Sequence, residues 1–149
     1  MSVPTNGQLA DVNVFLALLW PRHVHHSAAQ AWFAAQGHRN WATNSITQIG
    51  VLRLLTNLAI TGGAVNATTA LDTLAEATRH TNHQFWPLDC PVPSLLEGGA
   101  HGLIGHRRWT GLLLLRQAAE RKGKMVTFDK GLQELTPKEA RGSLLILEG

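Results

Sequence analysis

Cysteine is almost absent from this sequence of 149 residues, since Cys90 is the only one. A single cysteine excludes an intramolecular disulfide and a structural zinc site built from cysteines. Such a composition is typical of a protein of the reducing cytoplasm. Long hydrophobic runs are missing too, because the run over residues 14–20 is too short to span a bilayer. No basic segment precedes that run, which argues against a secretory signal and favours a cytoplasmic protein without a membrane span.

Charged residues are also scarce. Asp, Glu, Lys and Arg make up 15% of the chain, against 44% for hydrophobic residues, which is a globular composition. The length matches a single domain over residues 1–149. Thirteen Lys and Arg residues against ten Asp and Glu residues give a net charge of +3. This mild positive charge permits binding to nucleic acid but does not establish it.

Short hydrophobic strands alternate with helical segments along the chain. Strands are predicted at residues 8–10, 41–43, 83–86, 124–128 and 143–147. Helices are predicted at residues 14–19, after Ser27, after Ser45, after Thr68 or Thr69, at 94–97 and at about 106–122. Ser45 and Gln48 have the S-x-x-Q form of a capping box. The alternation predicts an α/β fold with a parallel sheet and helices on both of its faces.

Two aspartates directly follow predicted strands: Asp11 ends the first strand and Asp129 ends the fourth. Ligands of open parallel sheets bind outside the carboxyl ends of the strands, and adjacent strands would bring these carboxylates together. The positions make a carboxylate site possible without identifying a substrate. No glycine-rich phosphate loop follows the first strand, which disfavours a nucleotide-binding α/β domain.

Four stretches, taken in order, resemble a known family. They are Leu9-Ala-Asp-Val-Asn with the residues up to 18, then 41–56, then Phe85-Trp-Pro-Leu-Asp89, then 105–115 together with 124–132. Over residues 9 to about 132 the chain resembles the PIN-domain ribonucleases of the VapC type, toxins of bacterial toxin–antitoxin pairs. The resemblance implies a three-layer α/β/α fold with a mostly parallel central sheet, and a homodimer. It also implies a metal-dependent endoribonuclease that cuts structured RNA, such as tRNA or rRNA, and is blocked by a small antitoxin protein.

Enzymes of this family hold Mg²⁺ or Mn²⁺ with a cluster of carboxylates, and the resemblance assigns these positions residue by residue. Asp11 matches the first acidic position and Asp129 the last, so both would bind the metal. Thr127 matches the hydroxyl residue that precedes the last aspartate. Hard oxygen ligands are those that magnesium prefers. The ion would lower the pKa of a bound water and orient the phosphodiester.

The other two acidic positions have lost their carboxylates. The second falls on Gln48, which keeps an oxygen acceptor but no charge. The third falls on Gly111, which has no side chain and costs a helix interior about 1 kcal/mol relative to Ala. Two explanations of Gly111 stay open. Either activity was lost naturally, or Gly111 is an inactivating change that arose because an active toxin would poison its expression host. We expect weak or absent cleavage, and the alternative is an inactive PIN fold that binds RNA or an antitoxin.

Basic residues of the predicted last helix and the following strand form one stripe: Arg107, Arg108, Arg116, Arg121, Lys122 and Lys124. Phosphate contacts of this kind would position RNA without reading its sequence, although a solvated helix face is the simpler interpretation. We assign Asn13, His106, Arg107, Arg108 and Arg116 to RNA binding. Asn13 is also a candidate N-cap, and His106 is placed to cap the helix that it begins.

The remaining candidates have plain structural interpretations. The histidines at 23, 25 and 26 lack a partner cluster with zinc geometry, so they are assigned to a solvated loop. Asp89 and Glu97 are either substitute carboxylates or surface acids. Trp20, Trp32 and the Leu-rich helices suggest apolar contact between two copies of the chain.

Overall fold

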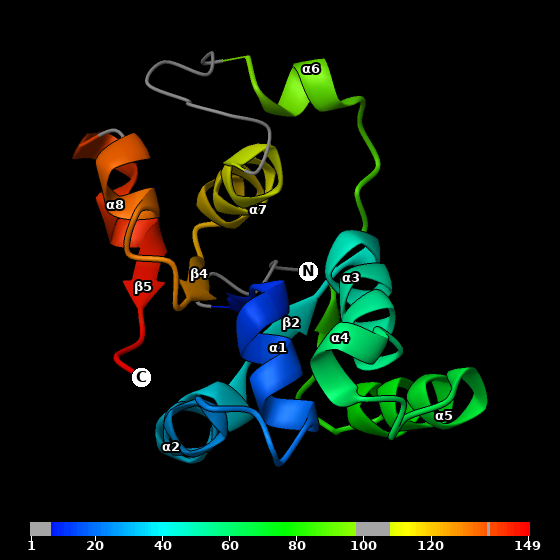
Figure 1. Ribbon diagram of the computed structural model, residues 1–149. Coiled ribbons are helices and arrows are strands. Elements are labelled where there is room, and N and C mark those ends of the chain that lie inside the picture. The colour runs from blue at the N-terminus through cyan, green and yellow to red at the C-terminus, as the bar shows by residue number, and fades with distance from the viewer. Residues whose placement is uncertain (1–6, 98–107, 137) are drawn as a thin grey trace.

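The computed structural model describes residues 7–97, 108–136 and 138–149, and its centre is a parallel sheet (Figure 1). The five strands lie in the order β3-β2-β1-β4-β5. They are β1 (Gln8–Ala10), β2 (Trp41–Thr43), β3 (Gln84–Phe85), β4 (Lys124–Thr127) and β5 (Leu144–Ile146). The first strand along the chain is therefore the central one, with β2 on one side and β4 on the other.

Helices cover both faces of this sheet. The helices of the described residues are α1 (Val12–Leu19), α2 (His26–Ala35), α3 (Ser45–Leu55), α4 (Leu58–Thr61), α5 (Ala67–Thr78), α6 (Val92–Leu95), α7 (Trp109–Glu120) and α8 (Leu132–Leu135), with the 3₁₀ turns η1 (Gly37–Arg39) and η3 (Lys138–Ser143). Figure 1 shows α7 on one side of the sheet and α1 with α2 on the other. The predicted three-layer α/β/α fold is confirmed.

Alternation along the strands divides the core in two. Leu9 and Met125 are fully buried on the α7 side, where they pack with Leu114. Their neighbours Ala10 and Val126 are fully buried on the opposite side, in the cluster that α1, α2, α3 and α5 cover. Successive side chains of a strand point to opposite faces, so β1 and β4 each contribute to both clusters.

Helix starts are where the structure corrects the sequence prediction most often. Asp11, not Asn13, is the N-cap of α1. Asn44, not Ser45, caps α3 and forms the capping box with Thr47, so Gln48 has no capping role. Each true N-cap has an extended backbone and a side-chain oxygen that accepts from an amide of the first turn. Where several capping residues are adjacent in sequence, only the backbone geometry decides among them.

Other differences concern short segments. Asn66 caps α5 in place of Thr68 or Thr69, and α2 begins at His26 with no side-chain cap. The turn expected at residues 94–97 is α6, two residues earlier, and α4 and α8 were not predicted. The beginning of the helix predicted from residue 106 lies outside the described residues. Within the described part of the chain, no helix is long and apolar enough to cross a membrane.

Candidate active site

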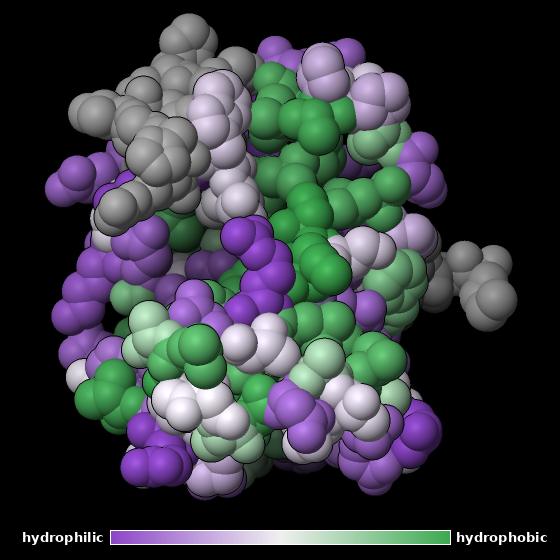
Figure 2. Space-filling model, turned by 45° about the vertical axis from the view of Figure 1, so that its right-hand side comes forward, coloured by the Kyte–Doolittle hydropathy of each residue, from purple (hydrophilic) through white to green (hydrophobic). Residues whose placement is uncertain are grey.

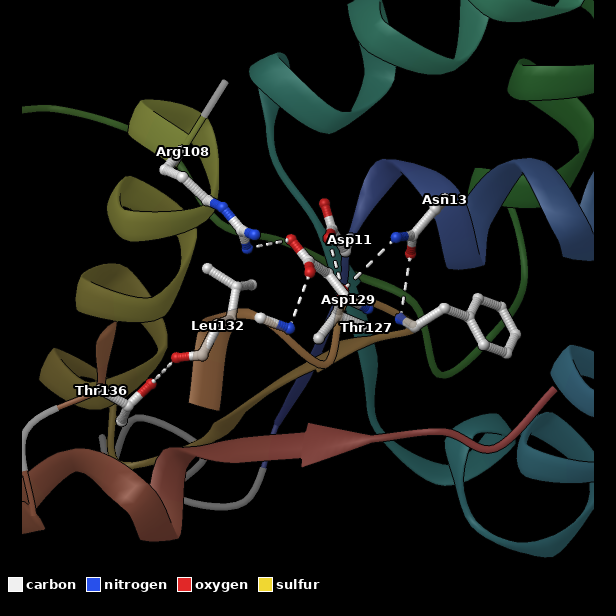
Figure 3. Close-up of polar contacts among 9 residues, drawn as sticks. Asp11, Asn13, Arg108, Thr127, Asp129, Leu132 and Thr136 are labelled. Atoms are coloured by element: carbon white, nitrogen blue, oxygen red, sulfur yellow. Dashed lines mark hydrogen bonds and ion pairs between the residues drawn. The ribbon is translucent and has the colours of Figure 1, made fainter. Parts of the chain in front are cut away.

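Asp11 and Asp129 meet at the carboxyl edge of the sheet, as their positions predicted, and Thr127 joins them (Figure 3). Asp11 follows β1, and its amide donates to the carbonyl oxygen of Val126 on β4 at 2.8 Å. Thr127 Oγ1 donates to Asp11 Oδ2 at 2.7 Å and accepts from the Asp129 amide at 3.0 Å. Thr127 is fully buried, so this hydroxyl fixes both aspartates relative to the sheet.

Asn13 reaches the same point from the first turn of α1. Its Oδ1 accepts from the amide of Phe128 at 3.3 Å, and its Nδ2 lies 3.5 Å from Thr127 Oγ1. The side chain therefore ties α1 to the end of β4. Asn13 makes these hydrogen bonds between α1 and the end of β4 and is not the N-cap that the sequence predicted.

Asp129 has both carboxylate oxygens engaged. Arg108 Nη1, from the N-terminal end of α7, lies 2.8 Å from Asp129 Oδ2 in an ion pair. The Gly131 amide donates to Asp129 Oδ1 at 3.0 Å. A Cβ at residue 131 would overlap the Arg108 guanidinium, so glycine is what lets the arginine approach so closely. The sequence analysis assigned Arg108 to RNA binding and missed this pairing.

Asp11 is electrostatically the unusual carboxylate of the two. Burial raises its pKa above the ordinary value, and the negative charge of Asp129 raises it further. Hydrogen bonds from the Thr127 hydroxyl and the Val12 amide lower the pKa in turn, but burial is the largest effect. Asp11 is therefore easier to protonate than a solvated aspartate.

Gln48 lies at the same edge of the sheet, over β2. Its Nε2 donates to Thr43 Oγ1 at 3.1 Å, and Thr43 Oγ1 is joined to His83 Nε2 at 2.7 Å. Burial lowers the pKa of His83, as does the nearby His80, while a hydrogen bond to the Thr78 backbone raises it. Because its amide nitrogen is anchored on Thr43, Gln48 is held by β2 and not by the aspartates.

Gly111 lies on α7 one turn after Arg108, and its neighbour is Leu132. A Cβ built on Gly111 would lie 2.9 Å from Leu132 Cδ2 and 3.3 Å from Leu132 Cδ1. Leu132 is 1% exposed, and its carbonyl oxygen accepts from Thr136 Oγ1 at 2.6 Å at the C-terminal end of α8. Residues 108 and 111 share a helix face, so a side chain at 111 would point toward the Asp129 turn.

The remaining predicted residues do not join this cluster. Arg116 is half-buried farther along α7, while His106 and Arg107 lie outside the described residues. Asp89 and Glu97 are exposed. Among the residues that the structure describes, no group of three or more His, Cys, Asp and Glu side chains could hold a metal ion. The histidine-rich loop after α1 therefore offers no such group either.

The arrangement is a pair of carboxylates with one associated cation. Carboxylate oxygens suit Mg²⁺ or Mn²⁺ in kind. They do not suit it in number, because Gln48 and Gly111 add no charge and Arg108 already neutralises part of Asp129. Such a site can take up a proton, accept hydrogen bonds and attract a cation weakly.

Comparison with curated proteins gives several similar chains. This chain is 40% identical over 126 residues to Ribonuclease VapC39 of Mycobacterium tuberculosis, which covers 85% of this chain and 91% of that protein. It is 31% identical over 139 residues to Ribonuclease VapC38 of the same organism, covering 93% and 96%. It is 37% identical over 127 residues to Ribonuclease VapC44, covering 83% and 87%. No family model matches the chain.

Proposed function

Because this chain belongs to the VapC ribonucleases, we propose that it is the toxin of a toxin–antitoxin pair and an endoribonuclease whose reaction takes place at Asp11 and Asp129. The observation that carries this proposal is the junction of the two aspartates through Thr127. The substrate would be a structured RNA, tRNA or rRNA, and the compartment the cytoplasm. The mild positive charge of the chain supports binding to RNA.

The proposed cofactor is Mg²⁺, which Mn²⁺ could replace, held by Asp11 and Asp129. When bound, such an ion would polarise the scissile phosphate and lower the pKa of a water. The two carboxylates fit its preference for oxygen, but the small number of charged ligands gives it a weak hold. We therefore expect millimolar or weaker affinity for Mg²⁺ and impaired cleavage.

The chain's own residues have separate tasks in this proposal. Thr127 keeps Asp11 Oδ2 oriented, which leaves the carboxylate in one position. Burial raises the pKa of Asp11, so in the absence of an ion this carboxylate takes up a proton more readily than a solvated aspartate does. Arg108 contributes a guanidinium beside Asp129, where it can also contact a phosphate oxygen. Gln48 contributes a neutral amide where the resemblance assigns an acidic residue.

A second candidate function is supported by the Arg108–Asp129 ion pair. That pair, together with Gln48 and Gly111, leaves little negative charge for a metal, so the chain would act by binding RNA or its antitoxin without cleavage. The decisive experiment incubates the purified chain with labelled tRNA and rRNA fragments in Mg²⁺, Mn²⁺ or EDTA. Metal-dependent cleavage that Asp11→Asn abolishes supports the nuclease. RNA binding that Asp11→Asn leaves intact, without cleavage, supports the binding module.

The proposed partners are a cognate antitoxin protein and a second copy of the chain. Trp32 is 3% exposed and is therefore core, not interface. Hydrophobic side chains are instead exposed on Ile49 of α3, Leu58 of α4 and Leu71 of α5. Figure 2 turns these helices toward the viewer and shows hydrophobic residues among polar ones on this side. We propose this face as the dimer contact.

A further inference from the structure

A polar hollow lies at the edge of the sheet opposite the aspartates. It has a volume of about 560 Å³, and its lining includes the first residues of three parallel strands: Gln8 of β1, Gln84 of β3 and Lys124 of β4. Arg39 and Lys122 contribute from the turns that precede β2 and β4. No acidic side chain is among its lining residues in the described part of the chain. We call this hollow the cation pocket.

The floor of the cation pocket is fixed by a buried amide. Gln8 is 5% exposed, and its Oε1 accepts from Trp32 Nε1 at 2.9 Å. Its Nε2 donates to Asn40 Oδ1 at 2.7 Å. Both ends of the amide are thus committed, so the floor cannot rotate to suit each ligand. A pocket that is ordered before binding loses less entropy when a ligand enters.

Among the residues that the structure describes, no acidic side chain pairs with the three cations of the pocket. Within the described residues, the ion pairs are Arg79 with Glu76 and Arg108 with Asp129, and neither involves Arg39, Lys122 or Lys124. All three side chains are exposed at the surface. Like charges that converge on one hollow repel each other until an anion enters.

Lys122 occupies a backbone conformation that favours glycine. Its φ is 58°, and it is the single non-glycine residue with positive φ in the described part of the chain. The amides of Lys122 and Gly123 donate to Ala119 and Ala118 at 3.0 and 2.9 Å, which is the Schellman pattern that ends α7. Glycine is the usual residue at the left-handed position of that pattern. A lysine at this position makes the fold less stable than a glycine would. Non-glycine residues with such backbone angles cluster at binding sites.

We propose that the cation pocket binds a phosphate group, with Arg39, Lys122 and Lys124 as its counter-charges. Its source is either the backbone of an RNA or a free oligophosphate. Only the RNA source rests on the proposed function, because phosphate binding itself requires no cleavage.

The test follows the indole N–H signal of Trp32 by ¹H–¹⁵N NMR, since that proton contacts the floor of the pocket. The uniformly labelled chain is titrated with inorganic tripolyphosphate, and separately with an RNA hairpin, in EDTA so that no RNA is cut. We expect saturable shifts of this signal. Lys124→Gln should weaken tripolyphosphate binding at least fivefold and lower the salt dependence of RNA binding by about one counter-ion. Lys130→Gln is the matched control for tripolyphosphate binding, because Lys130 is exposed at the other edge of the sheet.

Lys122→Gly separates binding from folding. Glycine relieves the left-handed backbone, so the melting temperature should rise by a few degrees while phosphate binding weakens. A rise in melting temperature with unchanged binding would mean that Lys122 has only a structural role, and would overturn the proposal. The proposal would also be overturned if Lys130→Gln weakened tripolyphosphate binding as much as Lys124→Gln does, or if the Trp32 signal did not shift. Weakening with both ligands identifies RNA as the source, and weakening with tripolyphosphate alone identifies a free oligophosphate. The two titrations therefore identify the source of the phosphate even if the chain cleaves no RNA.

Discussion

The hydroxyl of Thr127 and the carboxylate of Asp11 are joined by a 2.7 Å hydrogen bond across 116 residues of sequence. That hydroxyl also accepts from the Asp129 amide and from Asn13 Nδ2, so Thr127→Val removes three hydrogen bonds in a buried position. We expect it to destabilise the fold by about 1–3 kcal/mol, the cost of leaving buried polar groups unpaired. Urea unfolding measures this, and Thr127→Ser should restore most of the loss. A valine variant as stable as the parent would show that the hydroxyl does not hold the site.

Asp11 gives the stability a defined pH dependence. Its pKa is raised in the folded chain, so folding favours the protonated form and ionisation costs stability as pH rises through that pKa. Asp11→Asn should therefore raise the melting temperature at pH 7. The gain should vanish below about pH 4, where the aspartate is protonated in both states. Differential scanning calorimetry across pH checks this, with the exposed Asp89→Asn as control. A gain that persisted at low pH would contradict it.

Arg108 forms an ion pair with the carboxylate at which we propose that a metal ion binds. Arg108→Gln keeps a hydrogen-bonding side chain but removes the positive charge 2.8 Å from the carboxylate. We expect Mn²⁺ to bind about three- to tenfold more tightly, because the repulsion between guanidinium and ion is gone. Electron paramagnetic resonance of free Mn²⁺ measures the affinity, and Arg53→Gln, on the exposed side of α3, is the control. Weaker Mn²⁺ binding in Arg108→Gln would show that the arginine supports the metal.

Gly111→Asp places a carboxylate where the resemblance assigns an acidic residue, at a steric cost. The new Cβ would be 2.9 Å from a Leu132 methyl, so the buried leucine must shift. We expect a loss of about 1–3 kcal/mol of stability from overpacking, and Leu132→Val in the same chain should recover part of it. Cleavage of RNA in Mg²⁺ should rise by orders of magnitude and disappear in EDTA. No gain in cleavage by either variant would show that position 111 does not supply a ligand.

The exposed hydrophobic face supplies a prediction about assembly. Light scattering should give about twice the 16.2 kDa mass of one chain. Leu58→Glu with Leu71→Glu, which places charges on two side chains that are 74% and 57% exposed, should reduce it to the monomer mass. Val24→Glu, at an 85% exposed position after α1, should leave the mass unchanged. A parent chain that is monomeric at high micromolar concentration would contradict the dimer.

The order and periodicity of the sequence predicted the alternation of strands and helices and the place of the two aspartates. Asp11 and Asp129 could be placed together because each follows a strand, and parallel strands align their carboxyl ends. The pairing of Arg108 with Asp129 could not be predicted, since it depends on how closely α7 approaches the turn at Gly131. The N-cap at Asn44 was missed because Ser45 is an equally good capping residue by type. Helix α8 is too short for hydrophobic periodicity to reveal it.

The central position of β1 has a consequence for synthesis on the ribosome. The first strand made is paired on one side by β2, which follows within about 30 residues, but on the other by β4, which begins at Lys124. A nascent chain that ends before β4 therefore has an open edge on β1, and Asp11 there lacks the Thr127 hydroxyl. The two aspartates meet only when nearly the whole chain has emerged, so a truncated translation product carries no assembled carboxylate pair.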